Sequence, residues 1–533
     1  AGQTFFVDKN GDLQLTTNTA QSVGAESVYE SASAYMSEMA FDSTNNKVII
    51  VYPDQGNSSY GTVVVGTVDG TTISFGSPVV FKSSNIINTG FPNVTFDSNS
   101  NRVVIIYFDI DNSDAGTAVV GTVSDTSIGS FGTPVVYGGN SSAGYQEMLF
   151  DTSANKVVIA YRNGANSYYG TGIVGTVDSS DNSISFGTAS VFSSTNVGGI
   201  SMAFDSSNNK VGIFYQDGSD GHGKARVATV SGTSISYGTQ ATFASASTKY
   251  TQSTFDSSNN KVVVAFEDDA NSDYYTAIVG TISGTDITFG SEAVIYNNNV
   301  QNSIYHDITF DSSVNKVIHF SRGGTGGDDG RIHVGTVSGT DISFESGITI
   351  NASDAITSAA IVFDSNANKS VISYRDEGNS NYGTAAVFTA ANDLSGSLST
   401  DAVTAGAIAN GKPVIVNADG TVSSAVSDTP SAGTEVTFEA GSIDAGSQSL
   451  SSAFDSNTNR VVFAYRDSGN SDYGTAVVGT VSGSSISFGT PVVYESAEIT
   501  YPVCTFDSNS NKVVLCYQDQ GNSNQGTAIV GTV

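Results

Sequence analysis

Short apolar runs alternate with polar, turn-rich segments along this chain, and the alternation recurs nine times. Seven of the eight steps between the copies are 51 to 55 residues long, and one step is 91 residues long. A fixed period of this size indicates a repeat architecture, with an insertion in the long step. Each copy is marked by a Phe-Asp anchor, at Phe41, Phe96, Phe150, Phe204, Phe255, Phe310, Phe363, Phe454 and Phe506.

Each copy predicts four strands. In the copy at Phe454 these are the run before the anchor, RVVFAY, GTAVVGTV and ISFGTPVVY. FDSNTNR and VSGSS have the composition of tight hairpins, and RDSGNSDYG joins the second strand to the third. The second strand is apolar at every position instead of at alternate ones, so both of its faces must be buried.

Hairpin-connected sheets that are buried on both faces and repeat along the chain predict an all-β fold. The best match is a β-propeller of four-stranded antiparallel blades. A β-solenoid is the runner-up, although its usual repeat is shorter.

A circular closure is predicted from the order of the strands. Residues 21–30 match the fourth strand at 486–495, yet they precede the first anchored copy. The copy at Phe363 stops after its third strand, and the fourth-strand pattern resumes only at 433–439. The N-terminal strand is therefore expected to complete that copy.

The preferred division is a seven-bladed propeller over residues 21–390, closed by strand 21–30. Residues 1–20 form a partial β-hairpin module and 391–431 a related connecting module, while 432–533 supply two further blades that begin a second propeller. The alternative is a single nine-bladed propeller with an inserted β-hairpin module. Seven blades are common, whereas two isolated blades leave an open edge.

The net charge of the chain limits the kinds of partner that it is expected to bind. The 533 residues carry a net charge of −31, with only 20 Lys and Arg. Nucleic acid is not expected to bind, because phosphate recognition needs a basic stripe. No segment is long and apolar enough to insert into a membrane. The two cysteines, Cys504 and Cys516, occupy apolar slots and are expected to be buried free thiols; a cross-strand disulfide stays open.

The repeat resembles a known group of proteins. The residues that carry the likeness are YPDQGNSSYGTVVVGTVDGTTISFGSPVVF at 52–81 and the copy at 465–496. They resemble the repeat-rich proteins of marine bacteriophages, cyanophages especially, and AGQTFFVDKNGDL resembles hairpins of phage fibre proteins. The resemblance implies a virion-surface or extracellular location, and other virion proteins or copies of itself as partners. It brings no catalytic residues.

The loops between second and third strands share one face with the connectors between copies. The connectors differ in every copy, and a constant scaffold with variable loops is typical of recognition. A host cell-surface glycan or protein is the expected ligand there; solvated spacers are the alternative. The candidate ligand-binding residues are Tyr60, Tyr169, Tyr274, Tyr382, Tyr473, Asn57, Asn112, Asn271, Asn379 and Asn470.

The same loops carry candidate metal ligands, and Ca²⁺ is the one cofactor considered. Their spacing lacks the terminal Glu of a calcium loop, and capping of the turn is the competing interpretation. The Asp of the FDSxxN hairpin is expected to close an Asx turn. The candidate calcium ligands are Asp54, Asp109, Asp268, Asp376 and Asp467.

Two copies depart from the pattern. The fourth reads DGSDGHGKARV and the sixth SRGGTGGDDGRIHV. A metal or ligand site is one hypothesis for these copies, and surface or packing roles are the other. The residues concerned are Asp220, His222, His306, His319, Asp328, Asp329 and His333.

Catalysis is not expected. Acids recur in every copy, which favours turns, whereas sugar hydrolysis needs paired carboxylates at one unique place. No nucleophile elbow and no dense His/Cys cluster is present. The sequence thus predicts a non-enzymatic recognition protein of tail-fibre or adhesin type. A secreted or cell-surface bacterial lectin or adhesin is the alternative, and a polysaccharide-degrading enzyme is a less favoured alternative.

Overall fold

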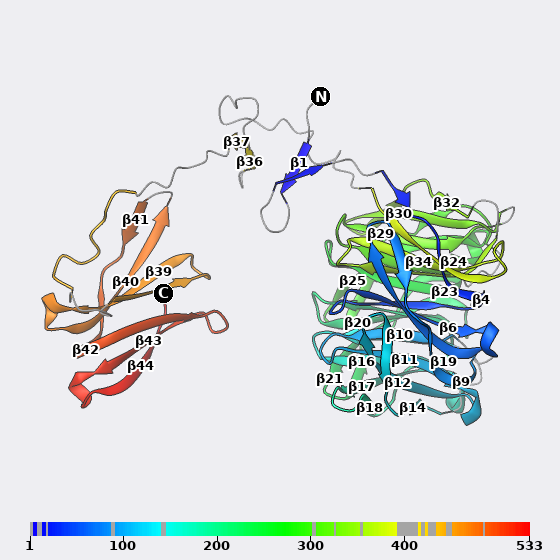
Figure 1. Cartoon of the computed structure of the whole chain (residues 1–533), viewed down its shortest axis with the longest axis horizontal. Helices are drawn as coiled ribbons and strands as arrows, with labels where there is room; N and C mark the ends of the chain where they lie inside the picture. Colours follow the sequence, from blue (N-terminus) through cyan, green and yellow to red (C-terminus); the bar gives the residue numbers. More distant parts are fainter. Residues whose placement is uncertain are drawn as a thin grey trace. The chain divides into compact units, whose positions relative to one another are not determined.

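The computed structural model describes residues 4–7, 13–16, 20–86, 91–139, 145–300, 305–324, 327–351, 355–391, 414–416, 422–424, 433–443, 450–482 and 485–533. The chain divides into two compact units, Ala1–Ser399 and Thr400–Val533. Strands dominate both, and the helices among the described residues are single 3-10 turns (Figure 1). No described helix is long and apolar enough to cross a membrane. The predicted all-β class is confirmed.

The first anchored copy forms one antiparallel sheet. It contains β5 (Glu38–Asp42), β6 (Lys47–Asp54) and β7 (Tyr60–Asp69) in that order. The predicted fourth strand is split in two, because β8 (Thr72–Phe75) and β9 (Val79–Asn85) pair with successive stretches of the same edge of β7.

Later copies in the first unit repeat this arrangement. In two places one long strand, β19 or β23, is the outer strand of one sheet and then the inner strand of the next. The strands are β10 (Asn93–Asp97), β11 (Arg102–Asp109), β12 (Ala115–Ser124), β13 (Ser127–Phe131), β14 (Val135–Gly138), β15 (Gln146–Asp151), β16 (Lys156–Asn163), β17 (Tyr169–Asp178), β18 (Ser183–Phe186), β19 (Ser190–Asp205), β20 (Lys210–Asp217), β21 (His222–Ser231), β22 (Ser234–Tyr237), β23 (Ala241–Asp256), β24 (Lys261–Asp268), β25 (Tyr274–Ser283), β26 (Asp286–Phe289), β27 (Ala293–Tyr296), β28 (His306–Asp311), β29 (Lys316–Arg322), β30 (Gly330–Ser338), β31 (Asp341–Phe344), β32 (Ile348–Ile350), β33 (Ile356–Asp364), β34 (Lys369–Asp376) and β35 (Tyr382–Thr389).

In the first unit, second strands are buried on both faces, as predicted. Val48 and Ile50 of β6 pack into one hydrophobic core, and Ile49 and Val51 pack into another on the opposite face. Each core lies between two successive sheets, so every sheet is covered by its neighbours. This packing explains why the second strands are apolar without alternation.

The inner strands form a closed circle. β5 contacts β10, and contacts continue through β15, β19, β23, β28 and β33 back to β5. Antiparallel sheets arranged radially in a closed ring are a β-propeller.

The N-terminal strands join the two ends of this ring. β4 (Ser27–Ser33) and β3 (Ser22–Val23) both pair with β35, which comes more than 300 residues later. In Figure 1 the dark-blue strand labelled β4 lies within the first unit, among strands that come much later in the chain. Val371 and Val387 share a hydrophobic core with Val48 and Ile50 at the junction. The N-terminal strands occupy the place of the fourth strand that the copy at Phe363 lacks.

In the second unit, the described strands of residues 450–531 form two successive sheets that share one long strand. Large apolar side chains stay exposed on them, with Val503 57% and Val530 62% exposed. Small hairpins lie in the two module segments: β1 (Thr4–Val7) with β2 (Leu13–Thr16), and β36 (Val414–Val416) with β37 (Val422–Ser424). The strands of the two sheets are β38 (Leu450–Asp455), β39 (Arg460–Asp467), β40 (Tyr473–Ser482), β41 (Ser485–Phe488), β42 (Val492–Asp507), β43 (Lys512–Asp519) and β44 (Gln525–Gly531).

The cysteines of this unit are both free. Cys504 is buried against Ala464 and Val462, but Cys516 is exposed. The prediction of two buried thiols is therefore wrong for Cys516. That side chain lies on a face of β43 that no described sheet covers.

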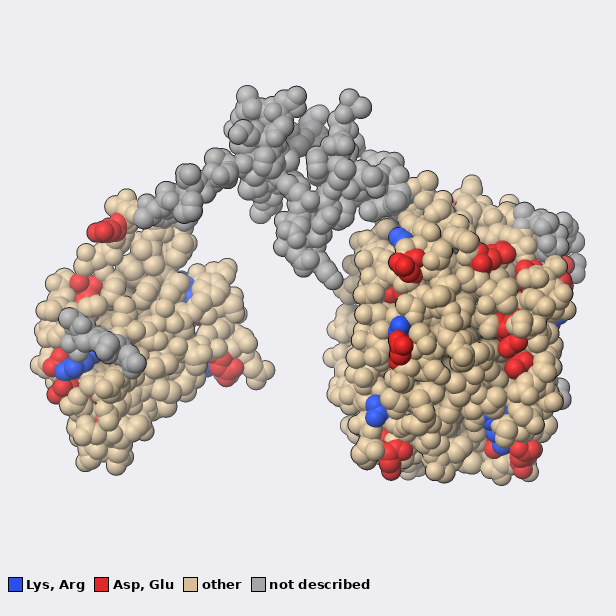
Figure 2. Space-filling view, viewed as in Figure 1, with Lys and Arg blue, Asp and Glu red and all other residues tan. Residues whose placement is uncertain are grey.

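Acidic side chains are spread over the surface. Figure 2 shows them dispersed over the visible face of the first unit, several of them beside a Lys or Arg. Lys82, for example, lies 2.7 Å from Asp109 and 3.0 Å from Asp111. On this face the acidic side chains are thus dispersed instead of gathered in one patch.

Candidate functional site

The FDSxxN hairpins have a structural role. Asp42 Oδ1 accepts hydrogen bonds from the backbone N–H groups of Thr44 and Asn45, both at 2.9 Å. Asn46 then adopts the left-handed conformation with φ of 55°. Equivalent Asp-to-backbone bonds occur at Asp205 and Asp256. The predicted Asx turn is confirmed, and it accounts for both the Asp and the Asn of the motif.

The candidate calcium ligands begin the loop between second and third strands. Three of the five, Asp54, Asp109 and Asp268, cap a 3-10 turn, and Asp376 caps an ordinary turn; in the first copy, Asp54 Oδ1 accepts from the N–H of Asn57 at 3.1 Å. They lie in different sheets and do not converge on one point. Asp109, Asp268 and Asp376 make the equivalent bonds, while no capping bond is described for Asp467. The turns are Gln55–Asn57, Ile110–Asn112, Gly164–Asn166, Asp269–Asn271, Ser468–Asn470 and Gln520–Asn522.

The candidate Tyr and Asn residues separate into two environments. The five tyrosines, Tyr60, Tyr169, Tyr274, Tyr382 and Tyr473, each open a third strand and are half-buried in the ladder. The five asparagines, Asn57, Asn112, Asn271, Asn379 and Asn470, are exposed in the turns. Each set is distributed one residue to a sheet, so the structure brings none of them together.

The loops do share a face with the connectors, as expected. Ala34 of the first connector bridges to Asp54, and Thr248 of another pairs with Asp268. Residues 87–90, 140–144 and 301–304 of three connectors lie outside the described residues. The connector at residues 243–252, which is described in full, lies within the long strand β23.

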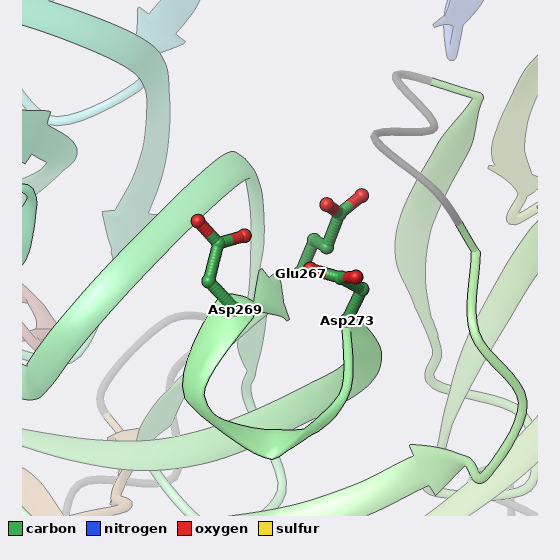
Figure 3. Close-up of side chains that lie close together, drawn as sticks. All are labelled: Glu267, Asp269 and Asp273. Carbon is green, nitrogen blue, oxygen red and sulfur yellow. The ribbon is translucent and has the colours of Figure 1, made fainter.

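One loop gathers three acids. Carboxylate oxygens of Glu267, Asp269 and Asp273 lie within 4.8 Å of one another around the turn after β24 (Figure 3). Lys249 lies 2.8 Å from Asp269 and 3.7 Å from Glu267. The ammonium group therefore already compensates part of this charge.

The unusual residues of the fourth and sixth copies do not form one site. His222 lies 3.2 Å from Asp220 in β21, at the surface. Asp328 and Asp329 form ion pairs with Arg322 and Arg331, at 2.7 and 2.8 Å. Within the described part of the chain, no metal-type cluster includes them.

The other three histidines are buried together in the sixth copy. His306 Nε2 donates to the carbonyl oxygen of Tyr250, and His319 Nε2 lies 3.2 Å from His306 Nδ1, to which it donates. Burial lowers the pKa of His306 and of His333 to about 4. A neutral histidine chain thus holds the backbone at Tyr250, whose φ is 51°.

A cavity of about 420 Å³ lies on the axis of the ring, and sequence reasoning missed it. Its central layer comes from the residue three positions before each anchor, on the inner strands. Most of those residues are polar, and they differ from copy to copy. They are Glu38, Asn93, Glu147, Ser201, Gln252 and Asp307, with Ala360 at the equivalent position of β33.

Three of these residues are carboxylic acids that influence one another. Burial and repulsion from Asp307 raise the pKa of Glu147 to about 8. Burial raises the pKa of Asp307 to about 7, although its oxygens accept the N–H groups of Ile308 and Ile361 at 2.7 and 2.9 Å. Burial, then repulsion from both other acids, raises the pKa of Glu38 well above its usual value.

An aromatic collar frames the end of this cavity that faces the connectors. A smaller hollow of about 80 Å³ lies there, and it shares Glu38, Asn93, Glu147 and Gln252 with the larger one. The frame comes from the residue five positions before each anchor. We define the collar as Phe91, Tyr145, Tyr250 and Tyr305; the other copies supply Met36, Gly199 and Ser358.

Two arginines contact tyrosine rings of the collar. The guanidinium of Arg162 lies 5.9 Å from the ring centre of Tyr145, and that of Arg322 lies 5.9 Å from the ring centre of Tyr305. The Tyr305 hydroxyl is 3.1 Å from that of Tyr35. These contacts fix the rings in place with part of each ring still accessible.

A signal for the cavity was present in the sequence. At a fixed offset before an otherwise uniform anchor, one position changes from Glu to Asn, Ser, Gln, Asp or Ala between copies. The uniform anchor serves the scaffold that all copies share, whereas this mostly polar position differs between copies and does not. Only the ring closure shows that the variable residues face one another.

Comparisons with known proteins found similar structures but no related sequence. No protein-family model and no curated protein matches this chain. The polysaccharide lyase Uly1 aligns with 70% of this chain and 100% of its own, at 8% identity and a TM-score of 0.43. The Aleuria aurantia lectin, solved with alpha-methyl-L-fucoside, aligns with 59% of this chain and 95% of its own, at 13% identity and a TM-score of 0.38.

A third similar structure is the Trypanosoma rangeli sialidase. It aligns with 72% of this chain and 57% of its own, at 11% identity and a TM-score of 0.37. All three TM-scores lie below 0.5.

Proposed function

We propose that this protein is a non-enzymatic recognition protein that binds a cell-surface glycan at the mouth of the central cavity. One observation carries the proposal: four aromatic side chains from four different sheets surround one hollow on the connector face. Aromatic faces stack on sugar rings, and nearby amides and carboxylates accept hydrogen bonds from sugar hydroxyls. A surface protein is the alternative ligand on the same face.

The location of the protein belongs to the same proposal. The sequence resemblance supports display on a virion, as a fibre or adhesin, with other virion proteins or copies of itself as partners. A secreted or cell-surface bacterial lectin is the competing class. Glycan binding at the collar is compatible with both classes of protein, because both would recognise the same kind of ligand.

The blade count is also proposed. Pairing of β3 and β4 with β35 supports a complete seven-bladed ring over residues 21–390. The exposed apolar faces of the second unit support residues 432–533 as the beginning of a second ring. A single nine-bladed ring would need β4 to pair with β44 instead.

Glycan binding by the full chain tests the proposed function. On a glycan array, we expect Tyr145→Ala and Tyr305→Ala to weaken binding about ten-fold or more, because stacked rings are lost. Tyr60→Ala and Tyr382→Ala are matched controls from the loop positions. Binding that survives both collar variants but is lost in the controls would place the site in the loops.

A further inference from the structure

We propose that the central cavity binds an amino sugar through its free ammonium group. This inference rests on the proposed function, since the cavity and the smaller hollow that the aromatic collar frames share four lining residues. It adds the chemical class of the sugar. It also assigns a role to the negative charge of the cavity acids, which recognition of neutral sugar hydroxyls does not require.

The cavity is built to accept hydrogen bonds from a cation. Glu38, Glu147 and Asp307 project into it from three different sheets. Among the described residues that line it, none is Lys, Arg or His. The acids therefore have no cationic partner there, and a positive ligand would relieve their mutual repulsion.

Two buried polar groups in the same layer also point to a ligand. Asn93, 6% exposed, donates from Nδ2 to Glu147 Oε1 at 3.1 Å, and its Oδ1 has no hydrogen-bond partner among the described residues. Ser201, 2% exposed, likewise has no partner for its Oγ in the described part of the chain. Buried polar atoms are costly to leave without a partner, so a ligand with N–H and O–H donors fits both.

The spacing of the acids favours an organic ammonium over a bare metal ion. Among the described residues, the one group of three acid or histidine ligand atoms within 4.8 Å of one another is Glu267, Asp269 and Asp273. The cavity acids are farther apart, so all three cannot directly ligate one small ion. An amino sugar fills more of the 420 Å³, a volume within the usual range for small-molecule sites.

The amino sugar is oriented by the cavity acids at one end of the site and by the aromatic collar at the other. The ammonium group donates hydrogen bonds to the carboxylates in the layer of Glu147, while the sugar ring extends toward the collar. Neighbouring hydroxyls reach Asn93 Oδ1 and Ser201 Oγ. Because the cation favours the ionised acids, binding near neutral pH releases protons.

Isothermal titration calorimetry of the full chain at pH 6.5 tests this inference, with glucosamine, N-acetylglucosamine and Ca²⁺ as probes. We expect glucosamine to bind about ten-fold or more tightly than N-acetylglucosamine, which lacks the charge. Its binding heat should depend on the ionisation enthalpy of the buffer, since protons are released. Glu147→Gln and Asp307→Asn should each remove most of the preference, whereas the exposed Glu345→Gln should not.

Each other outcome overturns the inference. Equal binding of both sugars, unchanged in Glu147→Gln and Asp307→Asn, means that the ammonium is not recognised, while collar recognition of neutral glycans stands. Proton-releasing binding of Ca²⁺ without glucosamine makes the cavity a metal site. Absence of binding by all three probes removes the cavity site, and the collar variants then test the proposed function separately. Circular dichroism confirms that each variant is folded.

Discussion

Glu147 shows how one residue links the cavity to stability. Its pKa is raised from 4.5 to about 8 in the folded protein. A raised carboxyl pKa means that the folded state holds its proton more tightly than the unfolded chain. The stabilisation is full below the unfolded value and is lost as pH rises toward 8.

We therefore expect Glu147→Gln to be more stable than the wild type at pH 8.5, by a few degrees in the melting temperature. The difference should shrink toward pH 4, where Glu147 is protonated in both states. Thermal unfolding monitored by circular dichroism at both pH values measures it. A constant difference across this range would contradict the assignment.

The buried histidines change the stability of the fold with pH in the opposite direction to Glu147. A pKa of His333 lowered from 6.5 to about 4 corresponds to about 3 kcal/mol between its neutral and charged forms. The stabilisation is full above the unfolded value and is lost as pH falls from 6.5 toward 4. Stability should therefore decline on both sides of neutrality.

We expect His333→Phe to lose less stability than the wild type between pH 7 and pH 4.5. The ring keeps its contact with Tyr296, whose centre lies 5.2 Å away, and no longer takes up a proton on unfolding. Urea unfolding at the two pH values provides the comparison. His222→Phe, at the surface, is the control and should follow the wild type.

At the scale of elements, a glycine at the same position in most copies lets neighbouring sheets approach closely. A Cβ on Gly76 would lie 1.8 Å from Thr126 O in the hairpin of the next sheet, and one on Gly238 would lie 1.8 Å from Thr285 O. The sixth copy has Glu345 at this position. The outer edge of β35 in the sheet that follows is paired with β3 and β4, and Glu345 accepts a hydrogen bond from Gln21 of this N-terminal segment at 2.7 Å.

We expect Gly238→Ala to destabilise the first unit by roughly 2–3 kcal/mol, because the added methyl group forces two sheets apart. Gly489→Ala is the matched control, since its Cβ would meet nothing nearer than Val478 O at 3.7 Å. Calorimetric unfolding of the full chain compares them. Equal effects would show that the approach of the hairpins does not limit packing.

At the scale of the molecule, closure depends on one N-terminal segment. Tyr29 and Ala34, 5% and 1% exposed, belong to the core between the first and last sheets. Two tyrosine hydroxyls also bond to this segment, Tyr374 to Glu26 at 2.6 Å and Tyr52 to Glu30 at 3.1 Å. The ends of the ring thus meet through strand pairing, a hydrophobic core and hydrogen bonds.

Deletion of residues 1–35 should lower the melting temperature of the first unit by roughly 10 °C or more, because an edge and a core are exposed. Deletion of residues 1–19 removes neither and is the control. A peptide spanning residues 20–36 should restore part of the loss by pairing with β35. An unchanged melting temperature in the longer deletion would contradict closure by this segment.

The sequence by itself determined the repeat, the strands and the turns. These depend on short stretches of sequence: an unbroken apolar run such as that of β6 requires two covered faces, Asp42 bonds to backbone N–H groups two and three residues later, and Asn46 takes the left-handed conformation. Because these short-range interactions recur in each copy of the repeat, the sequence pattern was enough to predict the all-β class and the Asx turns.

Only the tertiary structure decided where the copies converge. Glu38, Glu147 and Asp307 are more than 100 residues apart along the chain and carry no shared motif. Their proximity, their raised pKa values and the aromatic collar above them arise when the ring closes. The predicted loop residues, by contrast, are repeated once per sheet, and radial repetition keeps them apart. Repetition therefore revealed the scaffold, while the positions that break it, brought to one axis, form the candidate site.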